Sequence, residues 1–244
     1  MILVKTFYAY NDLRNFSYLV LDDETGDSWV IDPYEASTII DYIKKNSLNL
    51  RGILNTHSHF DHIRGNDELK RTFKVEVCEL KDSRIINLNS KFSLEGFASP
   101  GHTMDHTVFI WKEGEKAQAL FSGDTLFNSG VGNCKHGGDV NLLYETTMKL
   151  QTQIPATALL YPGHDYRKRN LEFAQKVEPE NKAVREALKK LENYETEKMP
   201  ASTLSEEFGV NPFFRLDSEE IKETLLIKNN KELFIKLRAL RDQW

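Results

Sequence analysis

Six of the seven histidines of this chain lie in three short clusters that also carry aspartates. The clusters occupy residues 57–62, 102–106 and 164–165, and the motif Gly123-Asp124-Thr125 lies between the last two. Imidazole and carboxylate groups are the protein ligands for zinc and similar divalent ions. If these groups act together, the fold must bring segments from residue 57 to residue 164 to one place. This pattern predicts a metal site, and its number of ligand-type residues favours a site for two metals.

The first cluster, residues 57–62, reads His-Ser-His-Phe-Asp-His. A helix would align positions three or four apart, and a strand would align alternate positions, so neither presents all four polar groups to one place. We therefore expect a loop or a strand-to-helix turn, between a strand that ends near Leu54 and a short helix that follows Asn66. Ligands on loops at strand ends are typical of an active site on a rigid scaffold.

Composition excludes several other classes of protein. The chain has 244 residues, of which 40% are hydrophobic and 28% charged, which fits one large globular domain with or without an appendage. Its net charge of −5 argues against nucleic acid as a partner. It contains no apolar run near the ~18 residues of a membrane helix, and its start lacks a signal-peptide pattern. With two cysteines, Cys78 and Cys134, outside any metal-site spacing, we expect a cytoplasmic protein with free thiols.

Apolar periodicity divides the chain into two parts. Up to about residue 165, short apolar runs alternate with turns and predict strands at 16–21, 29–31, 75–78, 107–111, 119–121 and 158–161. A helix is predicted at 36–45, whereas residues 82–94 are too weakly patterned to assign. After residue 165 the apolar spacing becomes helical, and Pro200 and Pro212 separate the helices. We expect the apolar helix faces there to pack as core rather than to bind a partner.

Two sets of motifs resemble known families. The stretch 56–62 resembles the signature of the metallo-β-lactamase fold superfamily, and the motifs at 101–103, 123–127 and 163–164 stand in that superfamily's order. The segments 163–181 and 200–215, the latter ending in Asn-Pro-Phe-Phe-Arg, resemble the type II glyoxalases, or hydroxyacylglutathione hydrolases. The resemblance extends over nearly the whole chain.

The resemblance implies both a fold and a reaction. The fold class is α/β (α+β), with a four-layer αββα sandwich over residues 1–165 as catalytic domain and an all-α substrate-binding appendage over 166–244. The reaction is hydrolysis of a small-molecule thioester, S-(2-hydroxyacyl)glutathione, as in methylglyoxal detoxification. S-D-lactoylglutathione would yield glutathione and a 2-hydroxy acid. We expect a monomer or a small homo-oligomer.

The ligand set also follows from the resemblance. One metal would be held by His57, His59 and His102, the second by Asp61, His62 and His164, and Asp124 would bridge both. The cofactors would be two divalent ions, zinc first, with iron or manganese as alternatives. A hydroxide between the ions would attack the thioester carbonyl, and the thiol, with a pKa near ~8.5, could leave as thiolate without a strong general acid. Asp61 and Asp124 would thus be both ligands and catalytic residues.

Other polar residues near these motifs have weaker expectations. His106 should hydrogen-bond a ligand rather than bind metal, and Asp32 either orients a ligand histidine or caps a turn. His136 is either a substrate contact or, more simply, a surface residue. Cys134 is expected to be inert. Two further aspartates are expected to be loop carboxylates or carboxylates that hydrogen-bond a ligand, rather than ligands themselves, namely Asp105 and Asp165.

For substrate binding, the sequence both matches and departs from the glyoxalase pattern. Tyr166 and Arg215 are retained, whereas Asn133 stands where the family usually has lysine and Lys135 where it has tyrosine. The segment 217–220 is acidic where the family is typically basic. Each lost charged hydrogen bond to the glutathione carboxylates should cost ~1.5–3 kcal/mol. Three cationic residues could compensate, namely Lys135, Arg167 and Lys168.

The main alternative function is a mononuclear iron persulfide dioxygenase on the same fold, which uses two histidines and a carboxylate. That family shares the first cluster but generally lacks the long helical tail with the Asn-Pro-Phe motif, so the tail favours the hydrolase. A purely structural zinc site is normally four-coordinate and closed, and seven candidate ligands exceed that number. Lactonase and nuclease activities are weaker hydrolytic alternatives.

Overall fold

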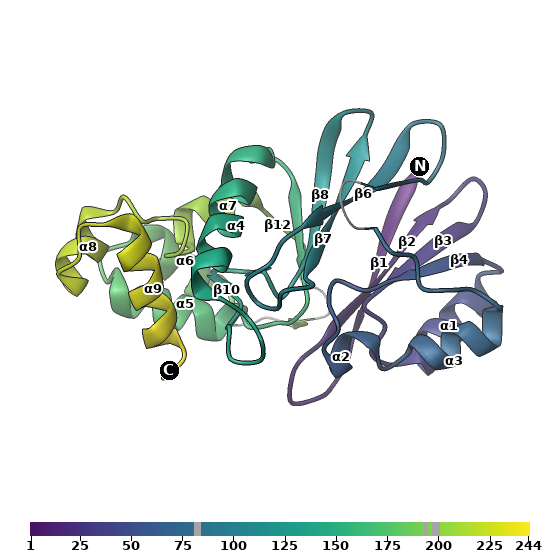
Figure 1. Cartoon of the computed structure of the whole chain (residues 1–244), viewed down its shortest axis with the longest axis horizontal. Helices are drawn as coiled ribbons and strands as arrows, with labels where there is room; N and C mark the ends of the chain where they lie inside the picture. Colours follow the sequence, from purple (N-terminus) through teal and green to yellow (C-terminus); the bar gives the residue numbers. More distant parts are fainter. Residues whose placement is uncertain (81–83, 193–194, 197–200) are drawn as a thin grey trace.

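Two β-sheets form the centre of the protein (Figure 1). The computed structural model describes residues 1–80, 84–192, 195–196 and 201–244. Within these ranges, a four-stranded sheet has the order β1 (Ile2–Tyr8), β2 (Phe16–Asp22), β3 (Asp27–Ile31) and β4 (Asn49–Leu54). A six-stranded sheet has the order β12 (Ser202–Thr203), β11 (Leu159–Pro162), β8 (Lys116–Gly123), β7 (Thr107–Glu113), β6 (Phe92–Ala98) and β5 (Ile85–Asn87). Pairing is antiparallel except between β3 and β4 and between β8 and β11.

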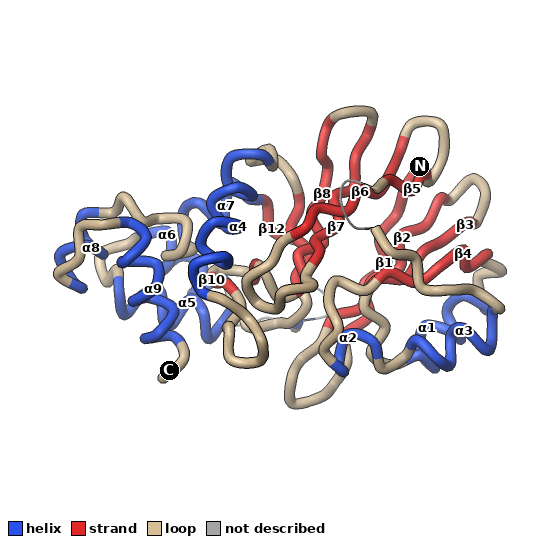
Figure 2. The backbone as a smooth tube through the Cα atoms, viewed as in Figure 1, coloured by secondary structure: helices blue, strands red, loops and turns tan. Residues whose placement is uncertain are grey.

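Helices cover the outer faces of both sheets (Figure 2). Helices α1 (Ala36–Lys45) and α3 (Asn66–Phe73) lie against the first sheet, and α2 (Phe60–Ile63) precedes α3. Helix α4 (Val140–Gln153) lies on the side of the second sheet and follows a small hairpin of β9 (Leu126–Phe127) and β10 (Gly130–Val131). The remaining helices are α5 (Arg167–Val177), α6 (Lys182–Lys190), α7 (Leu204–Val210), α8 (Glu219–Leu225) and α9 (Asn230–Arg241).

Buried side chains divide the core into layers that match this arrangement. Between the two sheets, aromatic residues of β2 pack against those of β8, as in the Tyr18–Phe121 pair with ring centroids 5.4 Å apart. A second cluster joins α1 and α3 to the first sheet, with Ile39 and Leu69 fully buried. A third joins α4 and α9 to the second sheet. These layers confirm the predicted αββα sandwich.

The C-terminal helices are not a separate layer, because they contribute a strand to the second sheet. Ser202 and Thr203 of β12 pair with Leu160 and Leu159 of β11. Helix α9 also packs on α4, where Phe234 meets Tyr144 at a centroid distance of 5.4 Å. The predicted apolar faces of these helices are buried, including Leu171, Ala174, Val177, Val184, Ile221, Leu233 and Leu237.

The predicted strand at 75–78 is wrong, while the predicted helix at 36–45 is α1. Only Val77 forms a β-bridge there, to Ile53 of β4. After Val77, the segment leaves the edge of β4 and reaches the second sheet. There, Leu80 lies so close to Gly96 of β6 that a Cβ added to Gly96 would overlap the Leu80 carbonyl oxygen. A segment that crosses between sheets cannot continue along one edge. Pro200, predicted to separate helices, and Asp82 lie outside the described residues.

In the described part of the chain, no helix combines the length and the apolar character needed to cross a membrane.

Candidate metal centre

The candidate ligands lie at the ends of strands from both sheets. His57 and His59 occupy the loop after β4, and Asp61 and His62 lie on the short helix α2 that follows. His102 lies in the loop between β6 and β7. Two further residues come directly after β8 and shortly after β11, namely Asp124 and His164. The expectation of a strand-to-helix turn at 57–62 is therefore confirmed, and β4 supplies the preceding strand.

The structure brings all seven of these side chains together. His57 Nε2 lies 2.9 Å from His59 Nδ1, which in turn lies 3.1 Å from His102 Nε2. On the other side, His62 Nε2 lies 3.3 Å from His164 Nε2, and Asp61 Oδ2 lies 3.5 and 3.4 Å from these two nitrogens. The ligand atoms therefore form two adjoining groups.

Asp124 lies between the two groups. Its Oδ2 lies 3.5 Å from His102 Nε2 in one group and 3.3 Å from His164 Nε2 in the other, and its Oδ1 lies 3.4 Å from His62 Nε2. The histidines around it hold the pKa of this buried carboxyl well below its usual range, although burial alone would raise it. Asp124 is therefore an anion in contact with imidazoles of both groups.

The donor set fits divalent cations. Asp124 Oδ1 is buried without a hydrogen-bond partner, and buried polar atoms normally have one. The ring nitrogens that face the cluster lie close together, and their lone pairs repel one another. Only a proton or a cation between them can stabilise this arrangement. His57, His62, His102 and His164 are all buried, so few water molecules can satisfy them. His/Asp clusters of this kind indicate a divalent metal site.

Each buried histidine is oriented by a hydrogen bond from its other ring nitrogen. His62 Nδ1 donates to Asp32 Oδ2 at 2.9 Å, and His102 Nδ1 donates to the Asn133 carbonyl at 2.6 Å. His164 Nδ1 donates to the Leu13 carbonyl at 2.8 Å. In the neutral form of each ring, this hydrogen bond leaves an Nε2 lone pair directed into the cluster, as in metal sites whose ligand histidines are held by outer partners. Burial alone would lower the pKa of His62, but Asp124, Asp32 and Asp61 raise it to about 9, so a cation that binds there replaces a proton.

Thr56 joins the same network through Asp32. Its hydroxyl donates to Asp32 Oδ2 at 2.6 Å, so the Thr56 oxygen can accept from His57 Nδ1 at 3.0 Å. The Thr56 backbone N–H also donates to Asp32 Oδ1. Asp32 adopts a φ of 50°, which is uncommon for aspartate. Of the two roles left open by the sequence, orientation of a ligand histidine is therefore the one that the geometry supports.

His106 lies behind the ligands. Its ring stacks on His57 with centroids 4.9 Å apart, and its Nε2 accepts the Asp124 backbone N–H at 3.1 Å. Nδ1 can then donate to Ser99 or Thr125. Burial lowers the pKa of His106 to about 3, so the ring is neutral. This position agrees with the expectation of a hydrogen bond to a ligand residue.

Two glycines make the close approach of these segments possible. A Cβ at Gly163 would overlap Asp124 Oδ1 and crowd the His62 ring. Gly123 has a φ of +47°, and a Cβ there would crowd Thr56 and His106. A side chain at either position would therefore disturb the cluster.

A cavity of about 340 Å³ opens beside the cluster, between the sandwich and the C-terminal helices. Tyr166 lines it and stacks on His164 with centroids 5.0 Å apart. Asn133 and Lys135 line it as well. The remaining lining residues are Asp12, Leu13, Phe127, Val131, Arg169, Asn170, Arg238, Arg241 and Asp242. Three of the four substrate-binding candidates from the sequence therefore share one cavity.

Among the cations that line this cavity, Lys135 was predicted from the sequence, whereas the arginines were missed. They come from α5 and α9 as Arg169, Arg238 and Arg241, and not from Arg167 or Lys168. Burial, and then repulsion from the other two arginines, lowers the pKa of Arg241 to about 10. Clustered guanidiniums of this kind favour an anionic ligand. The spacing of three residues between 238 and 241 was the available signal, because it places both on one helix face.

Arg215, the fourth candidate, is not brought to this cavity. Its guanidinium binds the buried carboxylate of Glu178 through two hydrogen bonds of 2.8 and 2.7 Å. Ser218 and Asn181 also donate to Glu178. The geometry therefore gives Arg215 a contact within the helical region and no contact with the cavity that Tyr166 lines.

The remaining candidates lie around the edge of the cluster. The ring of His136 lies 6.1 Å from that of His59. Burial raises the pKa of the Cys134 thiol to about 11, which agrees with an inert cysteine. Asp165 forms an ion pair with Arg14. The pKa of Asp105 is lowered by hydrogen bonds from Thr103 and Ser58, although burial opposes this shift.

Comparison with known proteins relates both parts of the chain to described families. Residues 11–91 match the metallo-beta-lactamase superfamily, and residues 165–244 match the hydroxyacylglutathione hydrolase C-terminus. A curated hydroxyacylglutathione hydrolase from Nitrosococcus oceani is 33% identical and covers 99% of this chain and 100% of its own length. The Arabidopsis thaliana protein named hydroxyacylglutathione hydrolase cytoplasmic is 32% identical, with 99% of both chains covered.

Solved structures show the same fold at lower sequence identity. A metallo-beta-lactamase from Staphylococcus aureus has a TM-score of 0.66 at 18% identity, with 98% of this chain and 72% of that chain covered. ETHE1 from Myxococcus xanthus has a TM-score of 0.65 at 20% identity, with 98% of both chains covered. These structures therefore support the sandwich architecture and carry no argument about the reaction.

Proposed function

Because this chain belongs to the hydroxyacylglutathione hydrolase family of the metallo-β-lactamase superfamily, we propose that it hydrolyses the thioester of S-(2-hydroxyacyl)glutathione. S-D-lactoylglutathione is the representative substrate, and the products are glutathione and a 2-hydroxy acid. The observation that carries this proposal is the juxtaposition of the seven-residue His/Asp cluster with an arginine-lined cavity. A hydrolytic centre and a site for an anionic thiol carrier thereby lie side by side.

The two ligand groups would hold two divalent ions, zinc first, with iron or manganese as alternatives. His57, His59 and His102 would hold one ion, and Asp61, His62 and His164 the other. Asp124 would contact both, since it already contacts imidazoles of both groups. Such ions supply a water of lowered pKa and a Lewis acid for a carbonyl oxygen.

The chain's own residues would position the substrate and the reacting groups. Asp124, whose pKa lies well below its usual range, would keep its carboxylate ionised beside the thioester carbon, and Asp61 would act next to it. Tyr166, stacked on His164, would form the wall between this place and the cavity. Arg169 and Arg241 would bind glutathione carboxylates, with Asn133 and Lys135 at the same wall. The departing thiolate is stable enough near neutral pH to need no strong acid.

The two parts of the chain would divide the work. Residues 1–165 would carry the catalytic centre, and residues 166–244 would complete the substrate cavity through α5 and α9. We also propose a cytoplasmic location, which is in line with the name of the Arabidopsis relative and with two free cysteines, Cys78 and Cys134.

The test combines metal content with turnover. The purified chain should contain close to two metal ions, measured by elemental analysis, and should release free thiol from S-D-lactoylglutathione. A panel of thioesters of other thiols, measured in parallel, identifies the carrier. One iron per chain, together with oxygen uptake on glutathione persulfide, would show that the dioxygenase alternative is correct instead.

A further inference from the structure

Asn15 directly precedes β2, next to the second ligand group. It is 1% exposed, and its Nδ2 donates to Asp61 Oδ2 at 2.8 Å. This is the same oxygen that lies 3.5 Å from His62 Nε2 and 3.4 Å from His164 Nε2. The amide hydrogen therefore holds the one carboxylate oxygen that both histidine nitrogens face.

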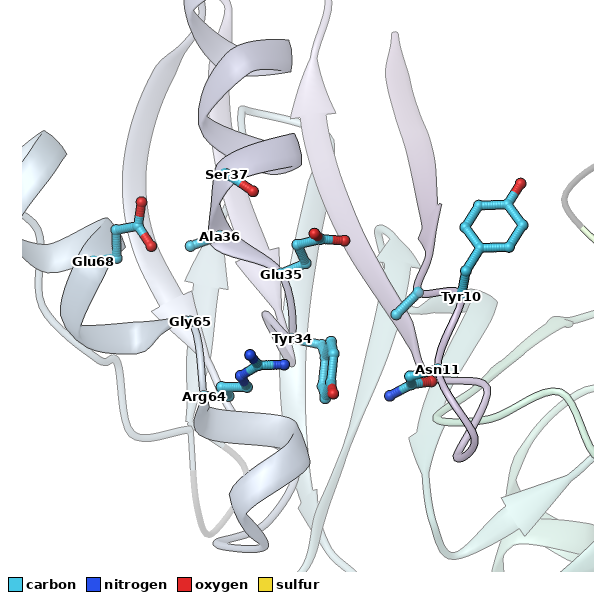
Figure 3. A pocket seen from close by; sticks show the side chains of 10 residues that line it. Tyr10, Asn11, Tyr34, Glu35, Ala36, Ser37, Arg64, Gly65 and Glu68 are labelled. Carbon is cyan, nitrogen blue, oxygen red and sulfur yellow. The ribbon is translucent and has the colours of Figure 1, made fainter.

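The direction of the Asn15 amide is itself fixed by Asn11. Asn11 Nδ2 donates to Asn15 Oδ1 at 2.8 Å, and the Asn15 backbone N–H donates to Asn11 Oδ1 at 3.2 Å. Because Asn15 Oδ1 is occupied as an acceptor, its Nδ2 must face Asp61. Asn11 also lies on the wall of a separate surface cavity of about 550 Å³ beside α1 and α3, where its side chain is seen near Tyr34 (Figure 3).

The same loop orients a second member of the group. Leu13 supplies the carbonyl that accepts from His164 Nδ1, and Asn15 forms a β-bridge with His164. Arg14, between them, adopts a φ of 59° and binds both the side chain and the carbonyl of Asp165. The loop is thereby fixed on both sides of Asn15.

We propose that Asn15, aligned by Asn11, is a positioning residue that sets the affinity of the Asp61–His62–His164 group for its metal ion. Asp61 Oδ2 must keep its place beside His62 Nε2 and His164 Nε2 for these three groups to bind one cation. A hydrogen-bond donor that holds this oxygen therefore prepares the site for the cation. Asn15 supplies that donor, and the other ligand group has no contact with it. This inference rests on the two-ion part of the proposed function and not on the identity of the thioester.

The test is metal affinity, measured on the whole chain by competition with a chromophoric chelator and by elemental analysis after desalting. Asn15→Leu keeps the approximate size of the side chain and removes the donor to Asp61 without adding a charge. We expect this variant and Asn15→Ala to retain close to one ion instead of two. The affinity for the more weakly held ion should fall ~10–100-fold, as is usual when an outer partner of a ligand is removed.

The matched control is Asn89→Ala. Asn89 Nδ2 donates to the buried carboxylate of Asp22 at 3.1 Å, in the same kind of contact but away from the cluster. It should lower thermal stability about as much as Asn15→Ala while retaining two ions. Asn11→Ala should weaken the second ion less than Asn15→Ala, because the amide can then rotate but remains present.

Two results would overturn the inference. One is an Asn15→Leu chain that holds two ions with the chelator affinity of the unmodified chain. The other is loss of the second ion in Asn89→Ala as well, which would trace the effect to general destabilisation. An unmodified chain that binds two ions but cleaves no thioester would contradict the proposed reaction and leave the role of Asn15 intact.

Discussion

At the scale of single residues, hydrogen bonds determine which nitrogen of each buried histidine faces the cluster. Donation from Nδ1 to Asp32, Leu13 or Asn133 leaves Nε2 free to bind a cation. The candidate ligands themselves could be predicted, because the clustering of histidine and aspartate is visible in the sequence. Their outer partners could not, since two of them are backbone carbonyls, which every residue has.

Asp124→Ala should remove more than a single ligand. The carboxylate contacts imidazoles of both groups, so we expect a chelator to remove both ions from this variant but at most one from the unmodified chain. Hydrolysis should be lost as well. Elemental analysis and thiol release measure the two effects. Asp27→Ala, which removes an exposed pairing with Arg51, serves as control and should change neither. Retention of two ions by Asp124→Ala would contradict the bridging role.

At the scale of elements, the sequence predicted α1 and the apolar helix faces but missed the path of residues 75–80. The spacing of apolar residues and the presence of helix-forming residues are local signals, and both predict α1 correctly. The passage from β4 to β6 depends instead on a contact between Leu80 and Gly96. Similarly, β12 is a strand because β11 lies beside it, and nothing in its two residues predicts that.

Arg215→Ala should destabilise the helical region by about 2–3 kcal/mol at pH 7, because it leaves the buried Glu178 without its cation. Burial alone would raise the pKa of Glu178. The hydrogen bonds from Arg215, Ser218 and Asn181 lower this pKa by more, so that it lies below its usual value. The stability from this pair is therefore present above about pH 4.5 and is lost as pH falls below it. Urea unfolding should show a smaller difference in unfolding free energy between Arg215→Ala and the unmodified chain at pH 4 than at pH 7.

Arg185→Ala is the matched control, since Arg185 and Glu180 form an exposed pair at 3.6 Å. It should cost less than about 1 kcal/mol at either pH. The KM of Arg215→Ala should remain within a few-fold of the unmodified chain when the protein is folded. A large rise in KM without loss of stability would return Arg215 to the substrate site, as the sequence motif suggested.

At the scale of the whole molecule, the cavity beside the cluster is formed where α5 and α9 meet the β9–β10 hairpin and the loop that follows it. The family resemblance pointed to the helical region, but not to Arg169 and Arg241. The packing of two helices determines which of their faces line a pocket, and the sequence of either helix alone does not predict that packing. Under the proposed function, these two arginines would offset the predicted deficit of cations near the glutathione carboxylates.

Arg241→Ala should raise KM for S-D-lactoylglutathione by about tenfold or more, since a charged hydrogen bond contributes ~1.5–3 kcal/mol. The kcat should change by no more than a few-fold, because anchoring of the carrier is the same in ground and transition states. Steady-state kinetics measures both constants. Arg51→Ala, on the first sheet and outside the cavity, is the control. A fall in kcat as large as the rise in KM would mean that Arg241 contacts the reacting thioester rather than the carrier.

Asn133→Lys should have the opposite effect. The side chain of Asn133 lines the cavity, while its carbonyl accepts from His102 whatever side chain is present. An added cation should therefore lower KM for S-D-lactoylglutathione and leave kcat within a few-fold. If KM is unchanged and a thioester of another thiol is cleaved much faster, glutathione is not the carrier.

The contacts of residues 13–15 with residues 163–165 also bear on how the protein is made. During synthesis, residues 57–62 leave the ribosome long before His164, yet this cluster alone offers three imidazoles and a carboxylate. Metal caught at that stage would have an incomplete set of ligands and no Asp124 or His164 to close it. Correct loading must therefore follow the pairing of the first loop with the end of β11, a late event that depends on distant contacts.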